Sequence, residues 1–98
     1  MNEQRDSSNR LTYDFSKIEI KSYLKITKSI ISHFELEEAS ELVHGFDETF
    51  QDFKSGRFLI GLEWDIWSGY IIVAKNLESE TLVKEIATYV NESFCKNT

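Results

Sequence analysis

The sequence predicts an α+β domain in which three helices pack with one antiparallel β-hairpin, in the order α-α-β-β-α. Apolar residues recur with helical spacing in two stretches before residue 56, alternate over residues 57–64, form a β-branched run over residues 70–75, and return to helical spacing from about 78 to 94. Spacing of three to four marks a helix, and strict alternation marks a strand. The 98 residues, 41% of them hydrophobic, suffice for one core. We therefore expect a polar, flexible N-terminus over residues 1–14 and a single domain over residues 15–98.

The first helix is expected over residues 17–34. Ser16 and Glu19 have the spacing of a capping box, and Phe15 with Ile20 matches a hydrophobic staple at the same N-terminus. The side opposite its apolar stripe carries four lysines: Lys17, Lys21, Lys25 and Lys28.

The second helix is expected over residues 37–54, ending at Ser55-Gly56. The stretch from Glu35 to Asp52 holds seven acidic residues and no lysine or arginine. In a helix, five polar residues would share an arc of about 80° opposite the apolar side: Glu37, Glu41, His44, Glu48 and Asp52. Like charges four residues apart repel each other. The acidic stripe therefore predicts either a basic partner or compensation by the lysines of the first helix.

The hairpin is expected from two strands, residues 57–64 and 70–75, joined by a loop over residues 65–69 that contains Gly69. Trp64 continues the buried face of its strand, whereas Trp67 lies in the loop and is expected to be exposed. Trp and Tyr often anchor protein interfaces. Asp65, Trp67 and Tyr70 are therefore candidates for contacts with a partner.

Composition and motifs argue against several classes of function. A net charge of −6 argues against general nucleic-acid binding, which depends on Lys and Arg. The sequence shows no secretion signal and no apolar run of membrane-spanning length, so a cytoplasmic protein without membrane association is expected. His33 and His44 have no second ligand at zinc-binding spacing, and Cys95 is the one cysteine. We expect no metal, no cofactor and no catalysis; a small enzyme would need a pocket built from Glu63, Asp65 and His44.

Residues 61–70, with the strand from Ile71 to Lys75 and the helix from Leu82 to Val90, resemble small bacterial immunity proteins of contact-dependent-inhibition and other polymorphic-toxin systems. The resemblance implies a non-catalytic cytosolic inhibitor of a cognate toxin domain, and many such toxins are basic nucleases. The acidic stripe would then mimic phosphate charge, while Trp67 and Tyr70 would anchor the contact. The candidate partner-binding residues are Glu37, Glu41, His44, Glu48, Asp52, Asp65, Trp67 and Tyr70.

The rival interpretation is a structural or regulatory domain that associates with itself. In that case the edge of the hairpin would pair between two chains, and the lysine and acidic helices would complement each other. A homodimer would show a mass above the 11.5 kDa of one chain and would need no other partner.

Overall fold

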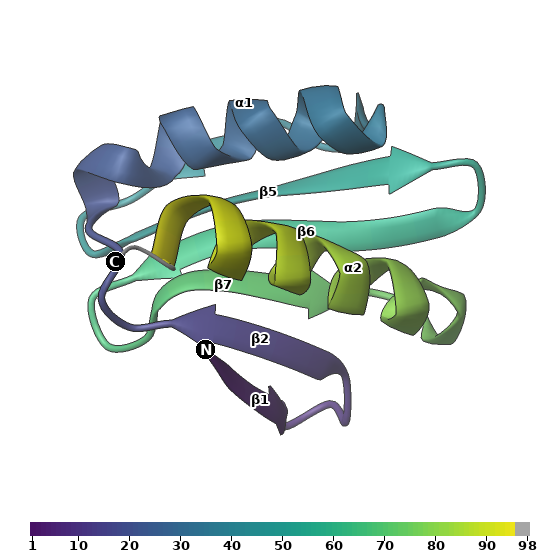
Figure 1. The fold of residues 1–98 in the computed structure, drawn as a ribbon, viewed down its shortest axis with the longest axis horizontal. Helices are drawn as coiled ribbons and strands as arrows, with labels where there is room; N and C mark the ends of the chain where they lie inside the picture. Colours follow the sequence, from purple (N-terminus) through teal and green to yellow (C-terminus); the bar gives the residue numbers. More distant parts are fainter. Residues whose placement is uncertain (96–98) are drawn as a thin grey trace.

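One antiparallel β-sheet forms most of the structure, and two helices cover one of its faces (Figure 1). The computed structural model describes residues 1–95. The strands run in the spatial order β1-β2-β7-β6-β5-β3, and β4 also pairs with β5. Their bounds are Asn2–Arg5 (β1), Leu11–Phe15 (β2), Glu37–Glu38 (β3), Val43–His44 (β4), Glu48–Ser55 (β5), Phe58–Asp65 (β6) and Gly69–Ala74 (β7).

The helices are α1 (Tyr23–Phe34) and α2 (Glu80–Val90). Three short helical segments adjoin them: η1 (Ile20–Ser22) before α1, η2 (Leu77–Ser79) before α2, and η3 (Asn91–Cys95) after it. The domain is thus α+β, but the predicted arrangement of three helices and one hairpin is wrong. Residues 1–95 form two α-helices and a seven-stranded sheet.

The largest difference concerns residues 37–54, which form β3, β4 and most of β5 instead of a helix. Along β5 the side chains alternate, and Thr49, Gln51 and Phe53 are buried on the helix side. Two of these three inward residues are polar, which hides the alternation in the sequence. The phenylalanines at 46, 50 and 53 also repeat the spacing of a helix, although Phe46 lies in a turn.

The N-terminal residues 1–14, which we expected to be flexible, contain β1 and most of β2. In β2, Leu11, Tyr13 and Phe15 alternate inward and are buried. The turn between the two strands is built around Asp6, whose carboxylate accepts hydrogen bonds from the backbone N–H groups of residues 8 and 10. β1 (NEQR) has no apolar residue, so its sequence gives no sign of a strand.

The core lies between the helices and the sheet. Tyr23 of α1 donates a hydrogen bond to the Leu62 carbonyl of β6 (2.6 Å), and Thr27 bonds the Tyr70 hydroxyl of β7 (2.6 Å). The side chains that α2 contributes to the core are Val83, Ile86, Ala87 and Val90. Both helices therefore pack on the same face of the sheet (Figure 1).

The two edges of the sheet differ. β3 and β4 form one interrupted edge beside β5, because residues 39–42 leave the regular ladder between them. Ser40 stabilises this irregular segment: its hydroxyl accepts from the Asp52 N–H (2.9 Å), and its carbonyl accepts from the Gln51 amide (2.9 Å). Such interruptions discourage pairing with another strand. β1 at the opposite edge is regular.

Candidate functional site

The face of the sheet opposite the helices is the candidate site, and we call it the open face. Successive side chains of a strand alternate between faces, and directly paired residues share a face. The strand register therefore assigns the open face without ambiguity. It carries six acids (Asp14, Glu37, Glu48, Asp52, Glu63, Asp65), two lysines (Lys54, Lys75) and five apolar side chains (Val43, Phe50, Leu59, Ile71, Val73).

Within residues 1–95 no helix covers this face, because α1, α2 and their short extensions all lie on the other side (Figure 1). Phe50, Leu59 and Ile71 are only half-buried there. The open face is therefore an acidic surface with apolar side chains between the charges.

Lys75 occupies the centre of the open face. Its Nζ lies 3.4 Å from Asp52 Oδ1 and 3.7 Å from Glu63 Oε2. Its side chain passes over Gly61, where an added Cβ would lie only 2.8 Å from Lys75 Cε. Burial raises the pKa of Glu63; the charge of Lys75 partly offsets this effect, and Asp52 adds to it. One lysine thus compensates part of the central negative charge.

Asp14 lies in the same row as Ile71 and Glu63 across three neighbouring strands. Its Oδ2 accepts a hydrogen bond from the Gln4 amide (3.3 Å). Its Oδ1 is buried and has no hydrogen-bond partner among the described residues. Buried polar atoms without a hydrogen-bond partner are rare in folded proteins.

The second part of the site is an exposed apolar end of the molecule, which we call the apolar tip. Seven of the nine large apolar side chains exposed in the described part of the chain belong to it, so exposure is concentrated here. They are Ile20, Leu24, Leu42, Val43, Phe46, Ile66 and Trp67. Monomeric proteins rarely expose such groups of apolar side chains without a function.

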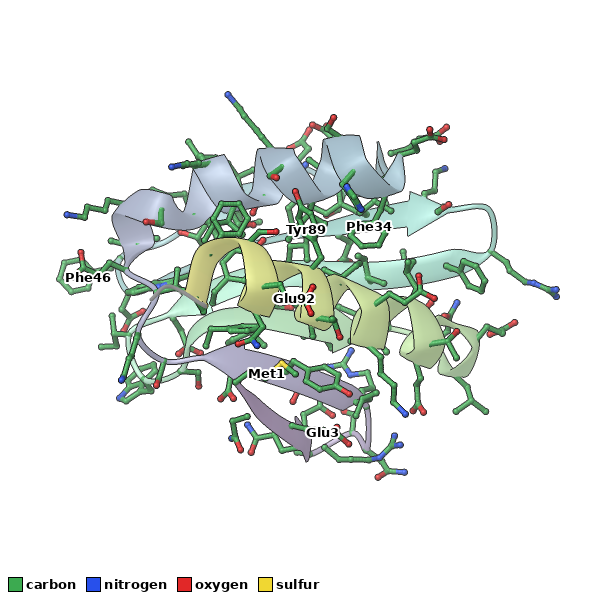
Figure 2. The ribbon with its side chains drawn as sticks, in the orientation of Figure 1. Met1, Glu3, Phe34, Phe46, Tyr89 and Glu92 are labelled. Atoms are coloured by element: carbon green, nitrogen blue, oxygen red, sulfur yellow. The ribbon has the colours of Figure 1, made fainter. Side chains whose placement is uncertain are left out.

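Two adjacent turns position the aromatic residues of the apolar tip. The β4–β5 turn carries Phe46, which is fully exposed and projects from the end of the molecule in Figure 2. The β6–β7 turn carries Trp67, which is 75% exposed. The Ile66 N–H donates to the Asp47 carbonyl (3.2 Å) and joins the two turns. Asp65 Oδ1 shapes the second turn by accepting from the N–H groups of Trp67 (3.0 Å) and Ser68 (2.6 Å).

A shallow apolar hollow of about 450 Å³ lies beside these turns, under the start of α1. Ile20, Leu24 and Leu42 supply its apolar walls, and His44 borders it. The His44 Nδ1 is hydrogen bonded to the Thr49 hydroxyl (2.7 Å). Its lining is mainly apolar.

The structure brings four of the eight candidate residues together on the open face: Glu37, Glu48, Asp52 and Asp65. Glu41 lies exposed in the 39–42 segment, and His44 and Trp67 belong to the region of the apolar tip. Tyr70 is different. Its side chain is fully buried on the helix side and bonded to Thr27, so it offers no surface to a partner.

Sequence reasoning missed Asp14, Phe50, Ile71 and Lys75 as residues of one surface. Alternation along residues 58–65 already placed Glu63 and Asp65 on one side of their strand. The other members come from β2, β5 and the end of β7, and only the pairing of these strands brings them together.

A catalytic pocket of Glu63, Asp65 and His44 does not form, since His44 pairs with Thr49 on the helix side and the two acids lie on the open face. Within residues 1–95 no group of three or more His, Cys, Asp or Glu side chains is arranged to hold a metal ion. In the same part of the chain, no helix combines the length and apolar character needed to cross a membrane.

Comparisons with protein-family models, with curated proteins and with solved structures yield no match.

Proposed function

We propose that this protein is a non-catalytic inhibitor of the immunity-protein type, which neutralises a cognate, basic toxin domain by binding it over the open face and the apolar tip. The observation that carries the proposal is an uncovered sheet face with six acids against two lysines and half-buried apolar residues between them.

The charge of the open face accounts for partner choice and speed of association. A surface with an excess of one charge attracts an oppositely charged surface over distances of about 10 Å at ordinary ionic strength. Complementary charge raises association rates more than it raises affinity. A basic nuclease-type domain fits this surface because its substrate-binding region must itself attract phosphate.

The apolar residues account for affinity. Phe50 and Ile71 are half-buried between the acids, so a partner that covers the open face removes their remaining apolar area from water. Phe46 and Trp67 extend the contact at the apolar tip, where an exposed tryptophan is a typical binding hot spot. The proposal therefore assigns steering to the acids and anchoring to these aromatic residues.

The first test is co-expression with the toxic C-terminal region of the protein encoded directly upstream. Rescue of growth, together with a co-purifying complex that weakens at high salt, is the expected result. A non-toxic neighbour, or toxicity that this chain does not relieve, would overturn the proposal.

A second test locates the binding surface. The double substitution Glu37→Lys and Glu48→Lys reverses two exposed acids of the open face. We expect the association rate with the toxin domain to fall roughly tenfold and to depend less on ionic strength. The matched control, Glu78→Lys with Glu85→Lys, makes the same change in net charge on exposed residues of η2 and α2. Equal effects of the two variants would mean that net charge, and not the open face, determines association.

A further inference from the structure

β1 is a free sheet edge of regular geometry. It is the last strand of the sheet, its four residues are all exposed, and the described residues place no strand on its outer side. Figure 1 shows β1 at the rim of the sheet, beyond both helices, and Figure 2 places Glu3 on this rim. The predicted edge for self-association, the hairpin, is not free, since β6 and β7 are both interior strands.

The backbone of β1 presents specific groups outward. The Asp6 N–H donates to the Arg10 carbonyl (3.0 Å), so in this antiparallel register the hydrogen-bonded pairs with β2 fall at residues 6, 4 and 2. The Gln4 carbonyl accordingly faces β2, where it also accepts from the Thr12 hydroxyl (3.2 Å). The N–H and C=O groups of Glu3 and Arg5 therefore point away from the sheet.

The charges of β1 are complementary to those of a second β1. An antiparallel pair centred on Gln4 sets Glu3 opposite Arg5 of the partner subunit, and Arg5 opposite the partner's Glu3. Opposite charges at such directly facing positions stabilise strand pairs. The outward backbone groups of the same two residues then exchange hydrogen bonds across the contact.

Both charged side chains are already held in place on the helix side. Arg5 bonds the Glu80 carboxylate (2.6 Å) and the Asn9 carbonyl (3.1 Å), and Glu3 accepts from the Tyr13 hydroxyl (2.9 Å). Restricting a side chain before association lowers the entropy that association must overcome.

We infer that β1 is a dimerisation edge whose partner is β1 of a second copy of this chain, related by a two-fold axis perpendicular to the sheet. Because directly opposed residues share a face, both sets of helices lie on one side of the combined sheet. The two open faces become one continuous surface on the other side. The inference does not depend on the proposed function, although it would give that function two binding surfaces in one assembly.

Sedimentation equilibrium and light scattering of the full chain test the inference. We expect the mass to rise with concentration to twice the 11.5 kDa of one chain. In Glu3→Pro, proline removes an outward N–H and leaves the intrachain pairs of Gln4 and Asn2 in place; edge strands tolerate proline at such positions. We expect this variant to raise the dimer dissociation constant at least tenfold. Glu3→Ala, which keeps the N–H, is the control and should have a smaller effect.

Charge exchange provides a test that does not rely on proline. Glu3→Arg sets two arginines opposite each other and should weaken the dimer, and adding Arg5→Glu restores opposite pairs and should recover part of the affinity. A wild-type chain that stays at 11.5 kDa at its highest attainable concentration, or a Glu3→Pro dimer as stable as wild type, would overturn the inference.

The two proposals fail in different ways. Glu3→Pro should still bind the toxin domain, and the Glu37→Lys, Glu48→Lys variant should still dimerise. Loss of self-association alone leaves the inhibitor proposal intact, and loss of toxin binding alone leaves the dimer intact.

Discussion

At the scale of single residues, Gly69 is the position with the least room for a side chain. Its φ is +75°, and an added Cβ would lie 2.2 Å from the Phe15 carbonyl oxygen and 2.8 Å from Ser16 Cα. Both neighbouring atoms belong to the backbone, so no side-chain rotation can move them away. The β6–β7 turn and the segment after β2 can approach this closely only because residue 69 is glycine.

We expect Gly69→Ala to lower the free energy of unfolding by about 3 kcal/mol or more, combining the left-handed backbone with a backbone clash. Gly56→Ala is the control, because Gly56 has a φ of +59° but no atom within 4 Å of the added Cβ. That control should cost only about 1–2 kcal/mol. Urea unfolding of both variants makes the comparison, and equal losses would contradict the assigned clash.

Glu63 makes stability depend on pH. Burial raises its pKa in the folded state above the ordinary 4.5, so just above that value the folded protein holds more protons than the unfolded chain. Stability from this group therefore falls as pH rises through the folded pKa, and the full cost is present at pH 7. Glu63→Gln cannot ionise. Compared with wild type, the Glu63→Gln protein should therefore be more stable at pH 7 than it is below pH 4.5. A stability difference that does not change with pH would contradict the raised pKa.

At the scale of elements, Ser79 connects the start of α2 to β6. It is fully buried; its hydroxyl accepts from the Leu59 N–H (2.8 Å) and donates to Asn76 Oδ1. One small side chain therefore satisfies a strand N–H and orients the turn that leads into α2.

Ser79→Ala should destabilise the fold by about 1–3 kcal/mol, since it leaves the Leu59 N–H without its acceptor. Ser32→Ala, on the exposed side of α1, is the matched control and should change stability by less than about 0.5 kcal/mol. Thermal or urea unfolding measures both, and a neutral Ser79→Ala would show that this junction does not depend on the hydroxyl.

At the scale of the whole molecule, the sheet separates a side packed by the two helices from the open face, which we propose as the binding side. Tyr70 faces the helices and Trp67 faces solvent, although only three positions separate them. The proposed function therefore gives these two aromatic residues opposite roles.

Tyr70→Phe removes the hydroxyl that bonds Thr27 and should cost about 1 kcal/mol of stability without changing toxin binding. Trp67→Ala should leave stability within about 0.5 kcal/mol and weaken binding roughly tenfold or more. Calorimetric titration with the toxin domain, beside urea unfolding, separates the two effects. Normal binding by Trp67→Ala would exclude the apolar tip as an anchor.

The sequence was most informative where local patterns and packing agree. The alternating residues 57–64 and the β-branched run 70–75 form most of β6 and β7, and the helical patterns contain α1 and α2. It was misleading at residues 37–54, where buried Thr49 and Gln51 replace apolar residues and Phe46 stands in a turn. It also missed β1, whose polar residues form a strand only because they pair with β2.

In the candidate site, too, some features were predictable from the sequence and others were not. The excess of acids over lysines and the exposure of Trp67 were readable from residue types and turn position. Their grouping was not, because Asp14, Asp52, Glu63 and Lys75 come from segments far apart in the chain, and only strand pairing sets them side by side. Lys75 is the clearest example of such grouping. It lies between Asp52 and Glu63 because Gly61, over which it passes, has no side chain.

The charge of the protein, the size of its core, the two helices and the central hairpin were predictable from the sequence, because these depend on composition and on contacts near in sequence. Within residues 1–95, tertiary contacts settle which acids share a face, that no helix covers this face, and which edge of the sheet is free. These properties depend on the register and order of strands distant in the chain, and no local periodicity encodes them.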